Sequence, residues 1–139
     1  MIERALLQLR DKCRFLVLVV LALLLPFNVA KGEEKVTGPE AESVRQTITG
    51  YILSDIKLKG GFFLYDPTLF RVVGMKFDRV HEGVTRTDQG QLFACVDMRD
   101  VRGSLYDLDV YVRKTDQGLK TAKLVIHKVD GEERPKAAD

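Results

Sequence analysis

The sequence lacks most of the features that staple or anchor small proteins. Of its two cysteines, Cys13 precedes an apolar run near the N-terminus, so Cys95 is the only thiol in the rest of the chain and no internal disulfide can form there. No apolar run reaches the roughly 20 residues that a membrane-spanning helix needs. Signatures of serine hydrolases, P-loop proteins, dinucleotide-binding folds and zinc fingers are absent. These absences exclude a disulfide scaffold and the best-known enzyme motifs.

The sequence also has little excess charge. Its formal net charge is +2, and residues 1–30 account for all of it, so residues 31–139 carry equal numbers of acidic and basic side chains. A neutral domain lacks the basic surface that attracts nucleic acids or anionic lipids. We therefore expect no nucleic-acid partner, and contact with a membrane only through an uncleaved N-terminal segment.

The N-terminus has the pattern of a secretory signal. An apolar run at residues 15–25 follows a basic start, and Ala30 supplies the small residue typical of a cleavage site. This pattern predicts export to the periplasm or the cell exterior, with residues 1–30 as a removable signal peptide. No cysteine follows the run, which excludes a lipid anchor there. Asn28 stands where a small residue is preferred, so an uncleaved anchor stays open as an alternative.

The rest of the chain predicts a single domain with its helix first. Residues 31–38 are polar and aperiodic, as in a linker, and 39–131 form the domain. An apolar stripe at helical spacing runs from Val44 to Ile56 and ends before a Gly-Gly pair. Turn signals then divide the chain into four or five strands. The charged end, 132–139, is expected to be a flexible tail.

This order of elements predicts an α+β fold with one N-terminal helix packed on a curved antiparallel sheet of four to five strands. Over residues 39–129 the arrangement resembles the cystatin-like and NTF2-like group of folds. The segments 81–83, 93–97, 106–109 and 126–131 resemble small uncharacterised exported bacterial proteins. The resemblance implies an exported compartment and supplies no activity, because a fold does not determine a function.

Alternation along three strands predicts a polar row on the face of the sheet away from the helix. Placing the apolar faces together pairs Asp97 with Asp107 and Cys95 with Asp109, and one register sets His127 beside Asp107. Opposed carboxylates repel, so one could serve as a general acid, or the carboxylates and the imidazole could hold a divalent metal. The alternative is a solvated face on which nearby basic residues neutralise the aspartates.

Two further polar residues have weaker functional interpretations. Cys95 is predicted to face Asp109, and a carboxylate raises a thiol pKa, which disfavours a nucleophilic cysteine. His81 lies beside Glu82 and Gly83, where we expect a turn histidine with a backbone partner. A ligand role for His81, including a metal pair with His127, is the alternative.

Aromatic residues are concentrated in one part of the sequence. Phe62, Phe63, Tyr65 and Phe77 lie close together and could line an apolar cleft between helix and sheet, or form an exposed patch that docks a partner. The alternative is that they belong to the core.

The sequence thus predicts a non-catalytic exported domain that binds a small apolar ligand or a protein partner, without a cofactor. Two alternatives remain open. One is a metal-dependent or acid/base enzyme module that uses Asp97, Asp107 and His127. The other is a membrane-tethered accessory subunit, if the signal is not cleaved.

Overall fold

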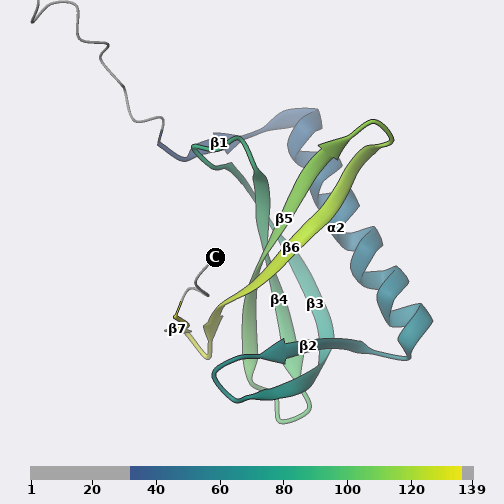
Figure 1. Ribbon diagram of the computed structural model, residues 1–139, viewed down its shortest axis with the longest axis vertical. Helices are drawn as coiled ribbons and strands as arrows, with labels where there is room; N and C mark the ends of the chain where they lie inside the picture. Colours follow the sequence, from purple (N-terminus) through teal and green to yellow (C-terminus); the bar gives the residue numbers. More distant parts are fainter. Residues whose placement is uncertain (1–31, 136–139) are drawn as a thin grey trace, which may run out of the picture. The chain divides into compact units, whose positions relative to one another are not determined.

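The computed structural model describes residues 32–135. The predicted signal peptide and the last four residues lie outside this range. The elements are β1 (Glu34–Val36), α2 (Gly38–Lys59), β2 (Phe62–Asp66), β3 (Arg71–Arg86), β4 (Leu92–Asp100), β5 (Leu105–Thr115), β6 (Gly118–Val129) and β7 (Glu132–Glu133) (Figure 1). Within the described range, no helix combines the length and the apolar character needed to cross a membrane.

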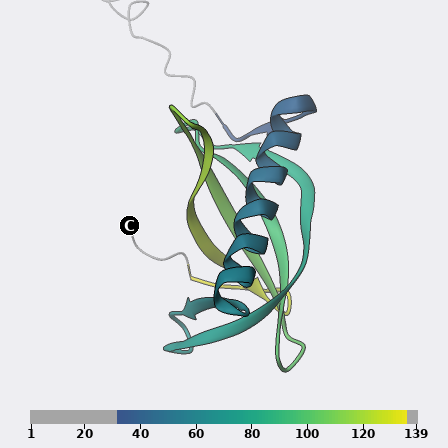
Figure 2. The ribbon, with the colours of Figure 1, turned by 90° about the vertical axis from the view of Figure 1, so that its right-hand side faces the viewer.

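The predicted fold class is wrong, because the described chain is mostly sheet. Strands make up 56% of it and helix 21%. Seven antiparallel strands follow the order β1-β3-β4-β5-β6-β7, with β2 paired to β3, and they curl as a half-barrel around α2 (Figure 2). This replaces the expected sheet of four to five strands. The added strands are β1, inside the segment predicted as a linker, and β7, inside the predicted tail.

The missed strands are too short to show a pattern in the sequence. β1 has three residues and β7 has two, so neither shows the alternation that indicates a strand. Both exist because they pair with a longer neighbour. Lys35 lies opposite Thr85 on β3, and Glu132 lies opposite Val129 on β6. Tertiary pairing, and not local sequence, forms these strands.

Helix α2 forms where the apolar stripe predicts it. Pro39 stands in the first turn, where its fixed φ suits a helix and its missing N–H costs nothing. At the other end Gly60 adopts a left-handed conformation with φ 75°, and its N–H donates to the Ile56 carbonyl over 2.8 Å. Val44, Ile48 and Ile52 are fully buried on the face between these ends.

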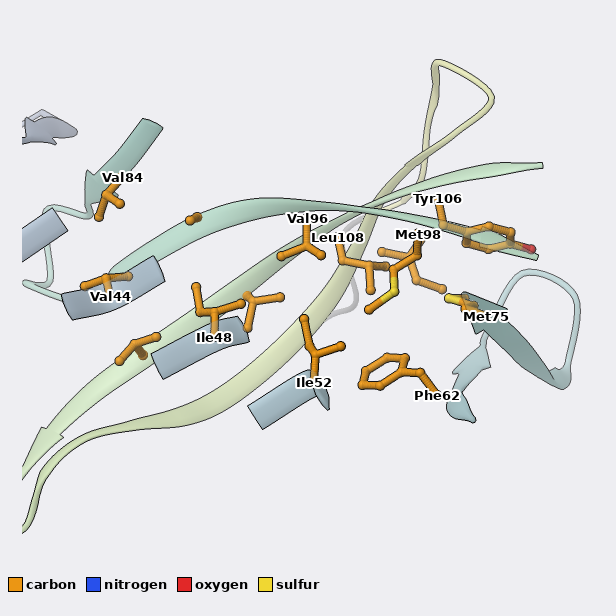
Figure 3. Packing of buried hydrophobic residues seen from close by; sticks show 14 of the residues in the cluster. Val44, Ile48, Ile52, Phe62, Met75, Val84, Val96, Met98, Tyr106 and Leu108 are labelled. Carbon is orange, nitrogen blue, oxygen red and sulfur yellow. The ribbon is translucent and has the colours of Figure 1, made fainter. Parts of the chain in front are cut away.

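The core lies between this helical stripe and the concave face of the sheet (Figure 3). Val96 and Leu108 lie opposite each other on β4 and β5, and both are fully buried beneath the helix. Burial of each large apolar side chain contributes roughly 1.5–3 kcal/mol. Because side chains alternate along a strand, the residues between them project from the other face. That outer face carries the polar row.

A candidate metal centre on the outer face of the sheet

The predicted pairing of β4 with β5 is confirmed. Asp97 lies opposite Asp107, and Cys95 lies opposite Asp109. Side chains directly opposite on one face of an antiparallel pair have Cβ atoms about 4.5–5.5 Å apart. Because Val96 faces the core, its two neighbours on β4 face outward. The Asp97–Asp107 and Cys95–Asp109 pairs therefore lie next to each other on the outer face.

His127 also lies near these pairs, but a β-bulge in β6 positions it there, which the alternation of residues does not predict. On β6, Lys128 lies opposite Asp107 and Ile126 lies opposite Leu108, so the register shifts at His127 and leaves it without a strand partner. His127 is thus not the strand partner of Asp107, but its donor atom still lies within 4.8 Å of that of Asp107. Such a β-bulge re-aims a side chain. The imidazole Nδ1 lies 3.5 Å from Asp109 Oδ1.

Four side chains from three strands converge at this point. Cys95, Asp107, Asp109 and His127 each offer one donor atom, and these four atoms all lie within 4.8 Å of one another. The Cys95 thiol donates to Asp109 Oδ1 over 3.1 Å. All four residues are partly buried, so the group is neither fully solvated nor sealed in the core.

Two atoms of this group are buried without a hydrogen-bond partner. They are Asp107 Oδ1 and His127 Nδ1, which are two of four such side-chain atoms in the described part of the chain. The 3.5 Å between His127 Nδ1 and Asp109 Oδ1 is too long for a good hydrogen bond. Buried polar atoms in native proteins nearly always have a partner, bound water and ions included. Both orphan atoms here are metal-ligand types.

The electrostatics of the group disfavour negative charge. Burial raises the pKa of Asp107, and the charges of Asp109 and Asp97 add to this effect, although His81 and His127 oppose it. Burial also raises the pKa of the Cys95 thiol to about 12, with a further contribution from its hydrogen bond to Asp109. The thiol is thus protonated at neutral pH, as the sequence predicted. Without a cation, this face therefore disfavours the ionised forms of Asp107 and Cys95.

Asp97 belongs to a separate, paired cluster. Arg79 Nε donates to its Oδ2, and His81 Nε2 contacts its Oδ1, each at 2.8 Å. Burial alone would raise the pKa of Asp97, but these two hydrogen bonds outweigh it and hold the pKa below its usual value. The structure therefore does not unite Asp97, Asp107 and His127 as one site. It assigns Asp97 to Arg79 and His81 instead.

His81 and Arg79 were not predicted as partners of Asp97. The expected turn histidine with a backbone partner is wrong, because His81 lies inside β3. Between Val80, opposite Val96, and Val84, opposite Ala94, β3 holds two more residues than β4, and this bulge contains His81. The sequence signal was available as a break in the alternation of apolar residues between Val80 and Val84.

The four aromatic residues predicted as a ligand or partner patch separate into two pairs. Phe62 is a core residue, and Phe77 is partly buried against the core. Phe63 and Tyr65, on the other face of β2, are about half exposed. Of the four, only Tyr65 lines an open groove of about 290 Å³ between β2 and β6. The structure thus does not bring the four together in one cleft.

Comparison with known proteins provides no functional information on this chain. No family model matches the chain, and no curated protein or solved structure shows a significant similarity to it. The functional interpretation therefore depends on the donor atoms of Cys95, Asp107, Asp109 and His127 and on their surroundings.

Proposed function

We propose that the protein binds one divalent metal ion, of the zinc type, on the outer face of its sheet. The ligands are Cys95, Asp107, Asp109 and His127. The observation that carries the proposal is the pair of buried, unpartnered atoms, Asp107 Oδ1 and His127 Nδ1, inside a group of four donors within 4.8 Å. A cation among these donors would give both atoms the partner that the protein does not provide.

The donor types select the class of metal. Zinc accepts sulfur, nitrogen and carboxylate oxygen in a four-coordinate arrangement. Magnesium and calcium prefer oxygen ligands alone, and their usual sites contain neither thiolate nor imidazole. The thiolate of Cys95 and the imidazole of His127 therefore favour zinc, or a transition metal with similar preferences. Two carboxylates and a thiolate also supply the negative charge that a dication needs.

The number of protein donors bears on what the metal does. Catalytic zinc sites have three protein ligands and an open position for water, whereas structural sites have four. Here Cys95 comes from β4, Asp107 and Asp109 from β5, and His127 from β6. A metal held by all four would tie three neighbouring strands together. This supports a non-catalytic metal-binding domain. The sequence suggested a metal-dependent enzyme as one alternative, and the proposal keeps the metal but not the catalysis.

The proposal is tested by equilibrium dialysis of the full-length protein against zinc. We expect one equivalent of bound zinc in the wild type and none in Asp107→Asn at the same free concentration. The matched control is Asp116→Asn, which changes an exposed aspartate in the β5–β6 turn and should keep full binding. Absence of binding in the wild type, or equal binding by the two variants, would overturn the proposal.

A further inference from the structure

A groove of about 290 Å³ lies where the half-barrel stays open. Two of its walls are β2 and the middle of β6, which lie side by side without pairing to each other (Figure 1). Arg134 and Pro135, which follow β7, also line it, and none of the four proposed metal ligands does. The groove is therefore a candidate site of its own.

Most of the surface inside the groove is apolar. The apolar lining includes Leu64 and Tyr65 from β2, Leu124 and Ile126 from β6, and Pro67 and Pro135. Small-molecule sites are typically clefts of this kind, mainly apolar with a few polar groups that fix the orientation of the ligand. At roughly 30 Å³ for each water molecule displaced, the groove has room for about ten non-hydrogen atoms.

Arg134 brings a guanidinium with unused donors to this apolar groove. Its side chain is 22% exposed, and its Nε is fully buried without a hydrogen-bond partner in the described part of the chain. Its contact with a carboxylate, from Nη2 to Asp66 Oδ2, measures 3.6 Å, which is too long for a good hydrogen bond. The two Nη groups are not fully buried, so a ligand can reach them. A guanidinium has five N–H donors, and Arg134 therefore has room for an acceptor from outside the domain.

Asp66, the acidic residue of the lining, is already engaged within the domain. It is fully buried, and its Oδ1 accepts hydrogen bonds from the N–H groups of Thr68 and Leu69, at 2.9 and 3.2 Å. Its Oδ2 lies 3.5 Å from the Tyr106 hydroxyl. These donors hold the carboxylate in place and compensate part of its charge. Asp66 thus lies on one side of the Arg134 guanidinium, and the remaining N–H groups are left for a ligand.

The charges of the lining favour an anion. Lys123 and Arg134 outnumber Asp66, so the charged residues that line the groove sum to +1. Glu132 and Glu133 precede Arg134 in the sequence but do not line the groove. The unsatisfied groups on Arg134 are all donors, and an anion supplies acceptors. The matching occupant therefore carries one negative charge on an otherwise apolar body.

We propose that this groove binds a small monocarboxylate with an apolar body. The carboxylate would contact Arg134, and the body would lie between Leu64 on β2 and Leu124 on β6. A carboxylate offers two oxygens in the geometry that suits a guanidinium, and such charge-assisted hydrogen bonds are stronger than neutral ones. This chemistry narrows the small apolar ligand expected from the sequence to an anionic one. It does not depend on the metal centre, so the metal-free protein should bind as well.

Methyl NMR spectra of the full-length protein, recorded with a chelator present, follow a titration with octanoate, whose size suits the groove. We expect the methyl signals of Leu64 and Leu124 to shift and to saturate. The signals of Leu119, near the start of β6, should stay in place. Octanamide has nearly the same shape without the charge, and it should bind the wild type about tenfold more weakly.

Arg134→Gln should weaken octanoate binding by about tenfold and leave octanamide binding nearly unchanged. The matched control is Arg113→Gln, which removes the same charge from an exposed position near the β5–β6 turn and should bind like the wild type. Equal affinity of the wild type for octanoate and octanamide would overturn the proposal, because the groove would then select only for apolar character. This comparison needs no variant to fold.

The position of the shifts separates this site from other places that attract octanoate, such as the apolar run 15–25. Octanoate binding without shifts at Leu64 and Leu124 would overturn the proposal. So would shifts of these signals that need only a higher protein concentration, because a second copy of the chain would then cover the groove. Binding that begins only after residues 136–139 are deleted would also overturn it, since the chain's own end would then be the occupant.

Discussion

The thiol of Cys95 donates a hydrogen bond to Asp109 Oδ1 across 3.1 Å, from β4 to β5. The proton in this bond is the one that a metal ion would replace. With the proton in place, Asp109 has a neutral partner, while Asp107 Oδ1 and His127 Nδ1 have no hydrogen-bond partner. With a dication in its place, all four side chains would share one partner.

Metal affinity should rise with pH and release a proton from Cys95. In the metal-free protein burial, followed by the bond to Asp109, raises the thiol pKa to about 12, so zinc must displace the proton throughout the neutral range. One displaced proton makes the apparent Kd fall by about tenfold for each unit of rising pH. Isothermal titration calorimetry in buffers of different ionisation enthalpy measures the released proton. Binding that releases no proton in the wild type would contradict thiolate ligation.

Replacing Asp107 by asparagine should stabilise the metal-free protein while it abolishes metal binding. Burial raises the pKa of this carboxyl, which means that the folded state disfavours its charge. A group with a raised folded pKa supports the fold while it is protonated and loses that support as the pH rises. We therefore expect a higher Tm for Asp107→Asn at pH 7, by about 2–4 °C, or about 0.5 kcal/mol.

The gain for Asp107→Asn should disappear on acidification, when the wild-type carboxyl is itself neutral. Thermal melting with a chelator present, at pH 7 and near pH 4, makes this comparison. Asp116→Asn serves as the control and should melt like the wild type at both values. A lower Tm for Asp107→Asn at pH 7 would show that the carboxylate stabilises the fold without a metal.

Replacing Asp97 by asparagine should have the opposite profile. The hydrogen bonds from Arg79 and His81 hold its pKa below the usual value against the effect of burial. A depressed pKa means that the carboxylate stabilises the fold above its unfolded pKa, near 4, and that this support is lost as the pH falls. We expect Asp97→Asn to cost about 1 kcal/mol at neutral pH and little in acid.

Asp97 lies outside the four donors, so its substitution should change zinc affinity far less than Asp107→Asn does. Denaturant unfolding and zinc dialysis of the same variant distinguish the two effects. A loss of zinc binding as complete as in Asp107→Asn would make Asp97 a ligand, and would contradict the division into two clusters.

Phe70→Gly should stabilise the domain although it deletes a large apolar side chain. The side chain is exposed, so little packing is lost, and glycine relieves the left-handed backbone at φ 51°. We expect a gain of about 0.5–1 kcal/mol in the free energy of unfolding, measured by urea titration. Phe77, which packs against the core, provides the comparison: Phe77→Ala should be destabilising. A destabilised Phe70→Gly would mean that Phe70 has packing partners within the domain.

The sequence was informative wherever the core controls the side-chain pattern. Burial of Val96 and Leu108 determines which faces of β4 and β5 point inward, so Asp97, Asp107 and their neighbours could be placed from alternation alone. The same argument failed at His81 and His127, because each occupies a bulge. β6 has one extra residue at His127 and β3 has two extra residues around His81. Such unpaired residues do not follow the alternation of the strand, and composition does not reveal them.

The prediction of four to five strands was wrong for a related reason. β1 and β7 are formed by pairing with β3 and β6, and segments so short have no period of their own.

Titration of the full-length protein with cobalt(II), followed by absorption spectroscopy, tests the central claim most directly. Cobalt replaces zinc in most sites and reports both on a bound thiolate and on four-coordinate geometry. The account predicts a thiolate-to-cobalt charge-transfer band that saturates at one equivalent, is abolished by Cys95→Ser and is reversed by added zinc. Saturation without that band, or a spectrum unchanged in Cys95→Ser, would contradict a metal centre built on Cys95, Asp107, Asp109 and His127.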